Sequence, residues 1–181
     1  TITAHADGVA TSDERLTVSG RDSLIERLTD YYLSRKDIAF APVPKSMALM
    51  TGAPYSGAFL RAYPRFNGLI WAYHWLQVGL YEPLIAAQTA ADKKAGVQIT
   101  LSRFWTMLDD PPAHFPRVMP MTPTIAPTFS AKHPRAAVIF DNLHMMHDVV
   151  SDVLASEKVP RNRKRAEILR AAELFRDASS Y

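Results

Sequence analysis

The longest apolar stretch of the chain, residues 66–90, restricts the fold more than any other feature. Its sequence is FNGLIWAYHWLQVGLYEPLIAAQTA, in which apolar side chains point in nearly every direction around a helix. A helix of this kind needs neighbours on most sides, so we expect it to be the central, buried helix of its domain. Pro83 is expected to kink it, because proline lacks a backbone donor and crowds the carbonyl of Gly79.

A membrane span is the alternative interpretation of the same stretch. A spanning helix takes roughly 20 consecutive apolar residues, and His74, Gln77 and Glu82 interrupt this one. The sequence therefore favours a helix that is buried in protein.

Helical spacing of apolar residues recurs in other parts of the chain. Ser23 and Glu26 have the spacing of a capping box, which indicates a helix start. Residues 93–109 contain a short alternating pattern and a longer helical one, and the longer pattern favours a helix over a strand. Pro134 and Pro160 suit the first turns of two further helices. The expected helices are residues 23–35, 66–90, 93–109, 134–156 and a last one after Pro160, with Ile168, Leu169, Ala172 and Phe175 as its apolar stripe.

The balance of glycine and proline supports this fold class. With 7 glycines and 13 prolines, a sandwich or barrel of tight hairpins is disfavoured, as is a glycine-rich phosphate loop. Residues 37–64 form a long connection with one expected helical turn at 45–50. Residues 111–134 contain seven prolines and no glycine, which predicts a stiff, largely non-helical crossing. We therefore expect an all-α domain of about five helices in a bundle-like packing over residues 22–181, preceded by an extended arm, residues 1–21.

Positive charge gathers near the C-terminus. Lys and Arg number 21 against 18 acidic residues, for a formal net charge of +3. Such a cluster suits an anionic membrane surface, a phosphate group or an acidic protein partner, or it is simply a solvated helix start. No aromatic residues alternate with these bases, which disfavours nucleic acid. The cluster consists of Lys158, Arg161, Arg163, Lys164, Arg165 and Arg170.

The absence of cysteine excludes several cofactor classes. With no cysteine, the chain cannot form a zinc–thiolate site, an iron–sulfur cluster, a thiol nucleophile or a c-type haem attachment. The chain begins at Thr1 with a polar segment. Removal of a signal peptide from an exported protein would explain this start, and so would trimming of a longer chain. We expect a periplasmic or otherwise exported protein.

The densest grouping of potential metal ligands is the segment FDNLHMMHDVVSDVL, residues 140–154. On a helix, Asp141, His144 and Asp148 share one stripe with Asp152, and oxygen and nitrogen donors of this kind suit a divalent metal. Asp141 and His144 also have the carboxylate–x–x–His spacing of di-metal bundles, although the chain has no second such pair. The alternative is a solvated acidic face, in which His144 titrates high and pairs with Asp148.

Two other cofactors fit the same region less well. His74 lies among aromatic residues, and with His147 or a methionine it would supply the axial ligands of a non-covalent haem. The thioethers of Met119, Met121, Met145 and Met146 suit Cu(I). Methionine is more often a filler of protein cores, and aromatic neighbours of a histidine are more often ordinary core residues.

No sequence motif points to catalysis. The chain contains no Gly-x-Ser-x-Gly, His-Glu-x-x-His or Walker sequence. Three features need partners: the polar arm, the proline crossing and the basic cluster. We therefore expect a non-catalytic accessory subunit that docks on a larger assembly, with a membrane-associated assembly as one option. The alternative is a helical metal- or haem-binding protein with redox or oxygen chemistry.

Overall fold

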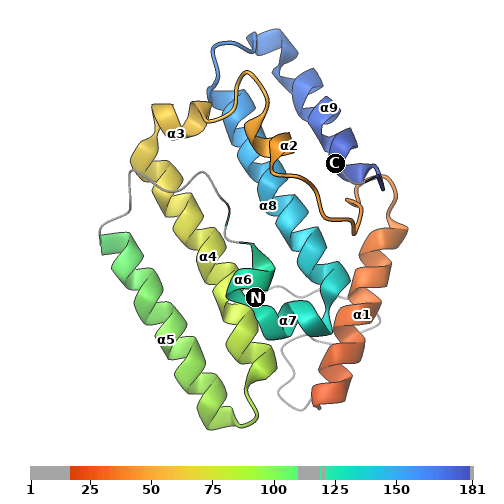
Figure 1. Cartoon of the computed structure of the whole chain (residues 1–181), viewed down its shortest axis with the longest axis vertical. Coiled ribbons are helices and arrows are strands. Elements are labelled where there is room, and N and C mark those ends of the chain that lie inside the picture. Colours follow the sequence, from red (N-terminus) through yellow and green to blue (C-terminus); the bar gives the residue numbers. More distant parts are fainter. Residues whose placement is uncertain (1–16, 110–118, 120, 180–181) are drawn as a thin grey trace. The chain divides into compact units, whose positions relative to one another are not determined.

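A computed structural model describes residues 17–109, 119 and 121–179 of the chain. Within these residues the secondary structure consists of nine α-helices and one 3₁₀ helix, with no strand. The predicted all-α class is confirmed. Five of the helices have 13 or more residues, namely α1, α4, α5, α8 and α9 (Figure 1), and they correspond to the five that the sequence predicts.

The chain divides into two compact units, one ending at Ala39 and the other beginning at Phe40. The first unit contains α1 (Val18–Ser34), whose N-cap is Thr17: its side-chain oxygen accepts a hydrogen bond from the backbone N–H of Gly20 at 3.1 Å. The predicted start at Ser23 is therefore wrong by about a turn and a half, because a cap nearer the N-terminus satisfies the first free amides. Most of the predicted arm, residues 1–16, lies outside the described residues.

Two antiparallel helices, α4 (Pro64–Ala86) and α5 (Ala90–Asp109), lie side by side in the second unit (Figure 1). Pro64 occupies the first turn of α4, where its missing N–H costs nothing. The helix ends four residues earlier than predicted because Thr89 starts α5: its hydroxyl accepts from the backbone N–H of Asp92 at 3.1 Å. Pro83 lies inside α4, as expected.

The helix with the most buried residues is α8 (Pro134–Ala155) rather than α4. Eleven residues of α8 are buried, against five of α4, whose Phe66 and Tyr73 are more than half exposed. As expected of a central helix, α4 packs against α3, α5, α6 and α7, but it is less completely buried than the sequence predicted. Apolar residues all round α4 do not mean burial all round, because large aromatic side chains remain on its surface.

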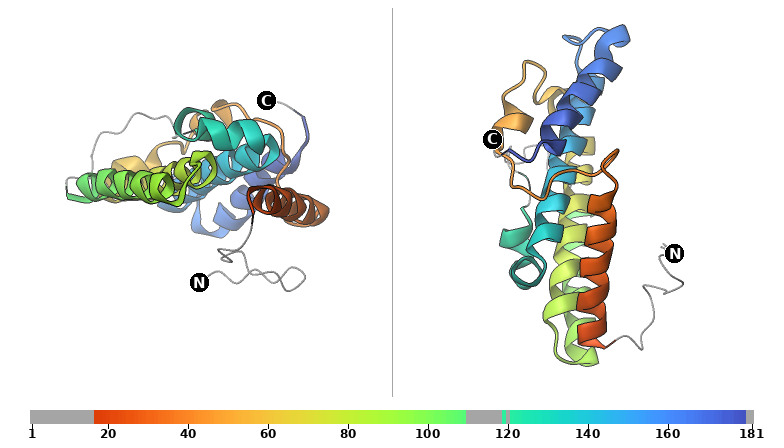
Figure 2. Two further views of the ribbon diagram at one scale, coloured as in Figure 1. Left: turned by 90° about the horizontal axis from the view of Figure 1, so that it is seen from below. Right: turned by 90° about the vertical axis from the view of Figure 1, so that its right-hand side faces the viewer.

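Four short helices replace much of the irregular chain that the prolines predicted. In the first long connection, α2 (Ala48–Thr51) overlaps the helical turn that was expected at 45–50, and α3 (Ala58–Ala62) is additional. α6 (Thr122–Ile125) and α7 (Pro127–Lys132) occupy most of the described part of the second, and they pack against α4 (Figure 2). Pro123 and Pro127 stand in the first turns of α6 and α7, where proline is tolerated. The predicted non-helical crossing is therefore wrong for residues 122–132, and residues 110–118 and 120 lie outside the described residues.

The main hydrophobic core joins α8 to the C-terminal helix. The 3₁₀ helix η1 (Arg161–Arg163) leads into α9 (Lys164–Arg176), whose Phe175 is 1% exposed and packs on Phe40 with ring centroids 5.6 Å apart. Leu169, expected in the apolar stripe of this helix, is 53% exposed, and Ala171 is buried instead.

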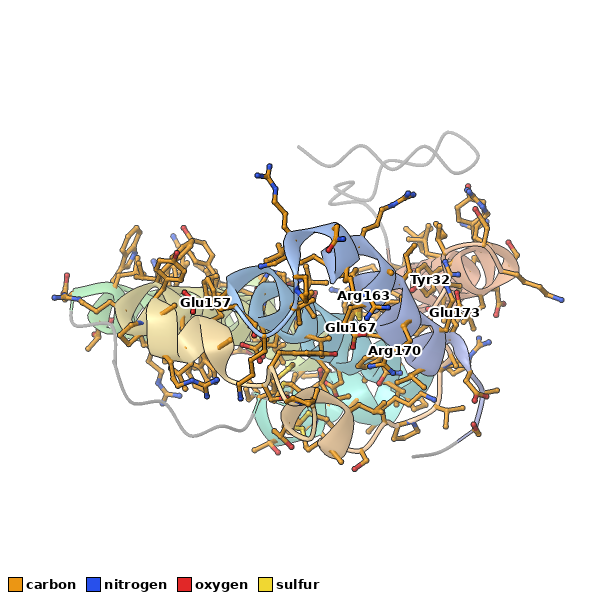
Figure 3. All side chains as sticks on the ribbon, turned by 90° about the horizontal axis from the view of Figure 1, so that it is seen from above. Tyr32, Glu157, Arg163, Glu167, Arg170 and Glu173 are labelled. Atoms are coloured by element: carbon orange, nitrogen blue, oxygen red, sulfur yellow. The ribbon has the colours of Figure 1, made fainter. Side chains whose placement is uncertain are left out.

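The basic cluster of the C-terminal region is partly engaged in local contacts. Arg170 pairs with Glu167 on α9 (Figure 3), with an Nη2–Oε1 distance of 2.6 Å. The ammonium of Lys164 donates to the backbone carbonyl of Leu154. The remaining bases, Lys158, Arg161, Arg163 and Arg165, are exposed.

Within the described part of the chain, none of the helices combines the length and the apolar character that crossing a bilayer requires.

Candidate metal centre

Three potential metal ligands meet where α4 faces α8. His74 of α4 and the adjacent His147 and Asp148 of α8 each offer one ligand atom, and these atoms lie within 4.8 Å of one another. The α8 backbone brings its two ligands to the same place because consecutive helical residues point about 100° apart and can flank a residue from the opposite helix. Among the described residues this is the one such group of three or more His, Asp or Glu side chains.

The three ligands stand at the edge of the molecule rather than in its core. The side chain of His147 is 48% exposed and that of Asp148 is 33% exposed, with 3.7 Å between Nδ1 of His147 and Oδ1 of Asp148. His74 is half-buried, and its ring meets that of His147 edge to face with centroids 4.9 Å apart. A metal ion in this group would therefore have protein on one side and solvent on the other.

Burial keeps the imidazole of His74 neutral. Its pKa falls from 6.5 to about 4, first because burial penalises the charged form and then because of repulsion from His144. The carboxylate of Asp148 opposes this shift. At neutral pH His74 therefore has a lone pair available for a metal ion, since only the neutral ring can act as a ligand.

His144 lies next to the group but forms a different set of contacts. Its ring stacks on that of His74 with centroids 4.5 Å apart, and its Nε2 lies 3.3 Å from Oε1 of Gln77. The amide of Gln77 donates to the hydroxyl of Tyr81 at 3.0 Å, so its oxygen faces His144 and accepts from the Nε2–H of that ring. Nδ1 of His144 is then unprotonated, and it is buried without a hydrogen-bond partner.

The expected high titration of His144 is wrong. Its pKa is lowered to about 4, because burial penalises the charged ring and His147 adds repulsion. In place of the expected ion pair with Asp148, His144 contacts Gln77. The solvated acidic face that was the alternative interpretation is also wrong, because Asp141, His144 and Asp152 are buried while Leu143 and Leu154 on the same helix are exposed.

Asp141, which lies nearer the start of α8 than His147 and Asp148, has a structural role. Its Oδ1 accepts from both the backbone N–H and the hydroxyl of Thr122, at 2.9 and 2.7 Å, and so holds the start of α6. Asp152 acts in the same way on α3, accepting from the backbone N–H groups of Gly57 and Phe59 at 2.7 and 2.9 Å. Of the predicted ligands Asp141, His144 and Asp148, only Asp148 therefore belongs to the three-ligand group.

His74 and His147, the predicted haem ligands, do lie close together. Their geometry suits a single metal ion and does not suit the two axial positions of a haem. Axial ligands approach a haem iron from opposite faces of the macrocycle, and an edge-to-face pair of rings 4.9 Å apart leaves no space for a porphyrin between them. The methionines considered for copper are core residues: Met119, Met145 and Met146 belong to the buried cluster, and Met121 packs against it.

The chemistry of the group is that of a site with three protein ligands. Two imidazole nitrogens and one carboxylate oxygen suit borderline dications such as Zn²⁺, Co²⁺, Ni²⁺ and Cu²⁺. All three residues were candidate ligands in the sequence analysis, but in two separate sites. Asp148 was assigned to the metal stripe, and His74 and His147 were assigned to the haem pair. The packing of α4 against α8 brings the three residues together, and no sequence pattern predicted the contact between these two helices.

The chain matches no protein-family model, no curated protein and no solved structure. What it does must therefore be inferred from the chemistry of its own residues.

Proposed function

We propose that this chain is a helical metal-binding protein that holds one divalent transition-metal ion between α4 and α8. The observation that carries the proposal is the convergence of His74, His147 and Asp148, whose ligand atoms lie within 4.8 Å of one another. Metal–nitrogen and metal–oxygen bonds of about 2.0–2.2 Å place cis ligands roughly 3 Å apart, so small side-chain adjustments complete the site.

The donor set favours a transition metal over magnesium or calcium. Mg²⁺ and Ca²⁺ take oxygen ligands almost exclusively, whereas two of these three donors are imidazole nitrogens. His74 is neutral at physiological pH because burial lowers its pKa to about 4, so a metal ion does not have to displace a proton from that ring.

Three protein ligands leave at least one coordination position to water. Structural zinc sites use four protein ligands, whereas sites with three keep an exchangeable position. The solvent side of this group, marked by the 48% exposure of the His147 side chain, is where that water would stand. The site is thus suited to reversible metal binding or to chemistry on a metal-bound water.

Equilibrium dialysis against Zn²⁺ at low micromolar concentration, with the protein stripped of metal beforehand, tests the proposal. We expect one ion per chain, and we expect His74→Gln, His147→Gln and Asp148→Asn each to weaken binding by about 10-fold or more. Glu157→Gln, which removes an exposed carboxylate outside the group, is the matched control and should bind as the unaltered protein does. Equal binding by all five proteins would contradict the proposal.

A second candidate function is the accessory subunit that the sequence predicted. The observation in its favour is a set of large exposed aromatic side chains on α4 and α5: Phe66 is 55% exposed, Tyr73 59% and Trp105 60%. Exposed apolar groups of this size often mark protein or membrane contacts. The anionic membrane surface, the larger assembly and the exported location remain predictions.

The second candidate is tested by the size of the particle that contains the chain in native extract. A docked subunit should migrate with an assembly much larger than 20.2 kDa, and Tyr73→Ser with Trp105→Ser should release it. Leu169→Ser on α9, which also removes a side chain that is more than half exposed, should leave migration unchanged. Migration of the unaltered chain as a free monomer would contradict docking.

A further inference from the structure

We propose that the groove between α4 and α5 binds a small aromatic carboxylate, with its carboxylate on Arg103 and its ring against Trp75. None of the residues that line this groove belongs to the three-ligand group. The inference is therefore independent of the proposed metal site.

The groove has the size and lining of a ligand site. Its volume is about 650 Å³, and its walls come from α4, α5, the turn that joins them, and α6. Sites for small organic molecules usually have volumes of about 300–1,000 Å³, with mostly apolar walls and a few polar groups. Trp75, Pro83, Ile99 and Ile125 supply apolar surface here.

The two helices approach each other closely at the floor of the groove. A Cβ added to Gly96 would lie 2.5 Å from Cβ of Pro83, and one added to Gly79 would lie 3.1 Å from Cγ2 of Thr100. At Gly96 only glycine permits so close an approach of the two helices, whereas an alanine at Gly79 would require the Thr100 methyl group to shift slightly. The indole of Trp75 lies 3.8 Å from the same point above Gly79, so a flat aromatic surface already stands over the floor.

The charges along the groove favour an anion at one end. Glu82 accepts from the backbone N–H of Thr128 at 2.9 Å, and Asp92 accepts from the hydroxyl of Thr89 at 2.7 Å, so both carboxylates are engaged. Arg103 has no hydrogen bond or ion pair with any residue that the structure describes. Its guanidinium is exposed to solvent, and among the three charged lining residues it is the one without a partner in the described part of the chain.

The spacing of these residues separates the cation from the acids. Asp92 precedes Arg103 by eleven residues on α5, which corresponds to about 16 Å along a helix. Glu82 follows Trp75 by seven residues on α4, or about 10 Å. Because the helices are antiparallel and Gly79 faces Thr100, Trp75 and Arg103 share one end of the groove. A planar acid fits this end, since a guanidinium binds a carboxylate in a bidentate manner and an indole stacks on an aromatic ring.

The test uses 2-naphthylacetate and its neutral amide as probes, titrated into ¹⁵N-labelled full-length protein. The acid should bind saturably and shift the indole N–H resonance of Trp75, which a Trp75→Phe variant identifies. The amide should bind at least 10-fold more weakly. Binding of acid and amide with equal affinity, or no saturable shift of the Trp75 resonance, would overturn the proposal.

Two substitutions of the same residue define the role of the cation. Arg103→Gln should reduce the affinity for the acid to that for the amide, and Arg103→Lys should retain part of the difference because it keeps the charge without the bidentate fork. Arg65→Gln, which removes a charge from an exposed position of α4 outside the groove, is the control and should bind the acid as the unaltered protein does. If Arg103→Gln bound the acid with unchanged affinity, the proposed contact between Arg103 and the carboxylate would be wrong.

Discussion

The imidazole of His144 on α8 stacks on that of His74 on α4, with ring centroids 4.5 Å apart and planes inclined by 19°. Two stacked imidazoles tolerate at most one positive charge, because two charged rings at this distance repel each other. Both rings are also withdrawn from water, and the pKa of each falls to about 4. The pair is therefore neutral at pH 7, and one ring nitrogen of His74 is unprotonated and available to a metal ion.

The stability of the metal-free protein should decrease as the pH falls from 6.5 to 4. Between these values the unfolded chain binds protons on His74 and His144 that the folded chain does not, so the free energy of unfolding rises with pH. The contribution of these two neutral rings to the free energy of unfolding is fully present above pH 6.5 and is lost as the pH falls through about 4. Urea unfolding of chelator-treated protein at several pH values measures it.

The matched variant for this prediction is His144→Gln, which can still hydrogen-bond to Gln77 but cannot titrate. It should remove on the order of 2 kcal/mol of the pH-dependent stability, because one depressed pKa no longer contributes. The carboxyl groups titrate alike in both proteins, so the difference between the two curves reports His144 together with the repulsion that it exerts on His74. Parallel curves for the two proteins would mean that His144 has an ordinary pKa.

Asp141 should be important for stability and unimportant for metal binding. Asp141→Ala leaves the backbone N–H and the hydroxyl of Thr122 buried without their acceptor, which costs roughly 1–3 kcal/mol. Denaturant unfolding gives the free energy, and dialysis against Zn²⁺ gives the affinity. A loss of metal affinity of 10-fold or more in a folded Asp141→Ala protein would return Asp141 to the ligand set.

Gly96→Ala should destabilise the α4–α5 pair, although alanine is normally the better helix residue by about 1 kcal/mol. The new methyl group would lie 2.5 Å from Cβ of Pro83, and relieving such an overlap typically costs about 1–3 kcal/mol. Ala95→Gly, at an exposed neighbouring position, reports the effect of helix propensity alone. A Gly96→Ala protein more stable than the unaltered one would show that the helices separate easily at this point.

The site should discriminate among cations by their preference for nitrogen. At a concentration 100 times its dissociation constant, a bound ion adds about 2.7 kcal/mol of stability, which raises the Tm by about 5–10 °C in a protein of this size. We expect this shift with Zn²⁺, Co²⁺ and Ni²⁺ and no shift with Mg²⁺ or Ca²⁺. Thermal unfolding followed by circular dichroism measures it, and equal shifts with Mg²⁺ and Zn²⁺ would contradict an imidazole site.

Helix positions were predictable where local signals agree. Residues 93–109 and 134–156 have sustained helical spacing, and Pro134 suits a first turn, so α5 and α8 appear nearly as expected. The short helices α6 and α7 were missed because Pro123 and Pro127 suggested interruption, whereas proline at the start of a helix is favourable. Each proline was compatible with either the interruption or the start of a helix, and only the surrounding packing decides between these two structures.

The orientation of α8 was not predictable from its own sequence. Its acidic stripe suggested a face toward water, but Asp141 and Asp152 turn inward because free backbone N–H groups at the starts of α6 and α3 need acceptors. Those helix starts are distant in sequence from α8. The same limit applies to the metal centre, where the contact of His74 with His147 and Asp148 depends on how α4 packs against α8.

The most direct test of the metal centre is X-ray absorption at the zinc edge of the loaded protein. We expect a first shell of nitrogen and oxygen atoms at about 2.0–2.1 Å, with the multiple scattering of two imidazole rings. In His74→Gln and in His147→Gln, the scattering should fall to that of one ring. A shell of oxygen atoms without imidazole scattering, or an unchanged spectrum in both variants, would contradict a centre formed by His74, His147 and Asp148.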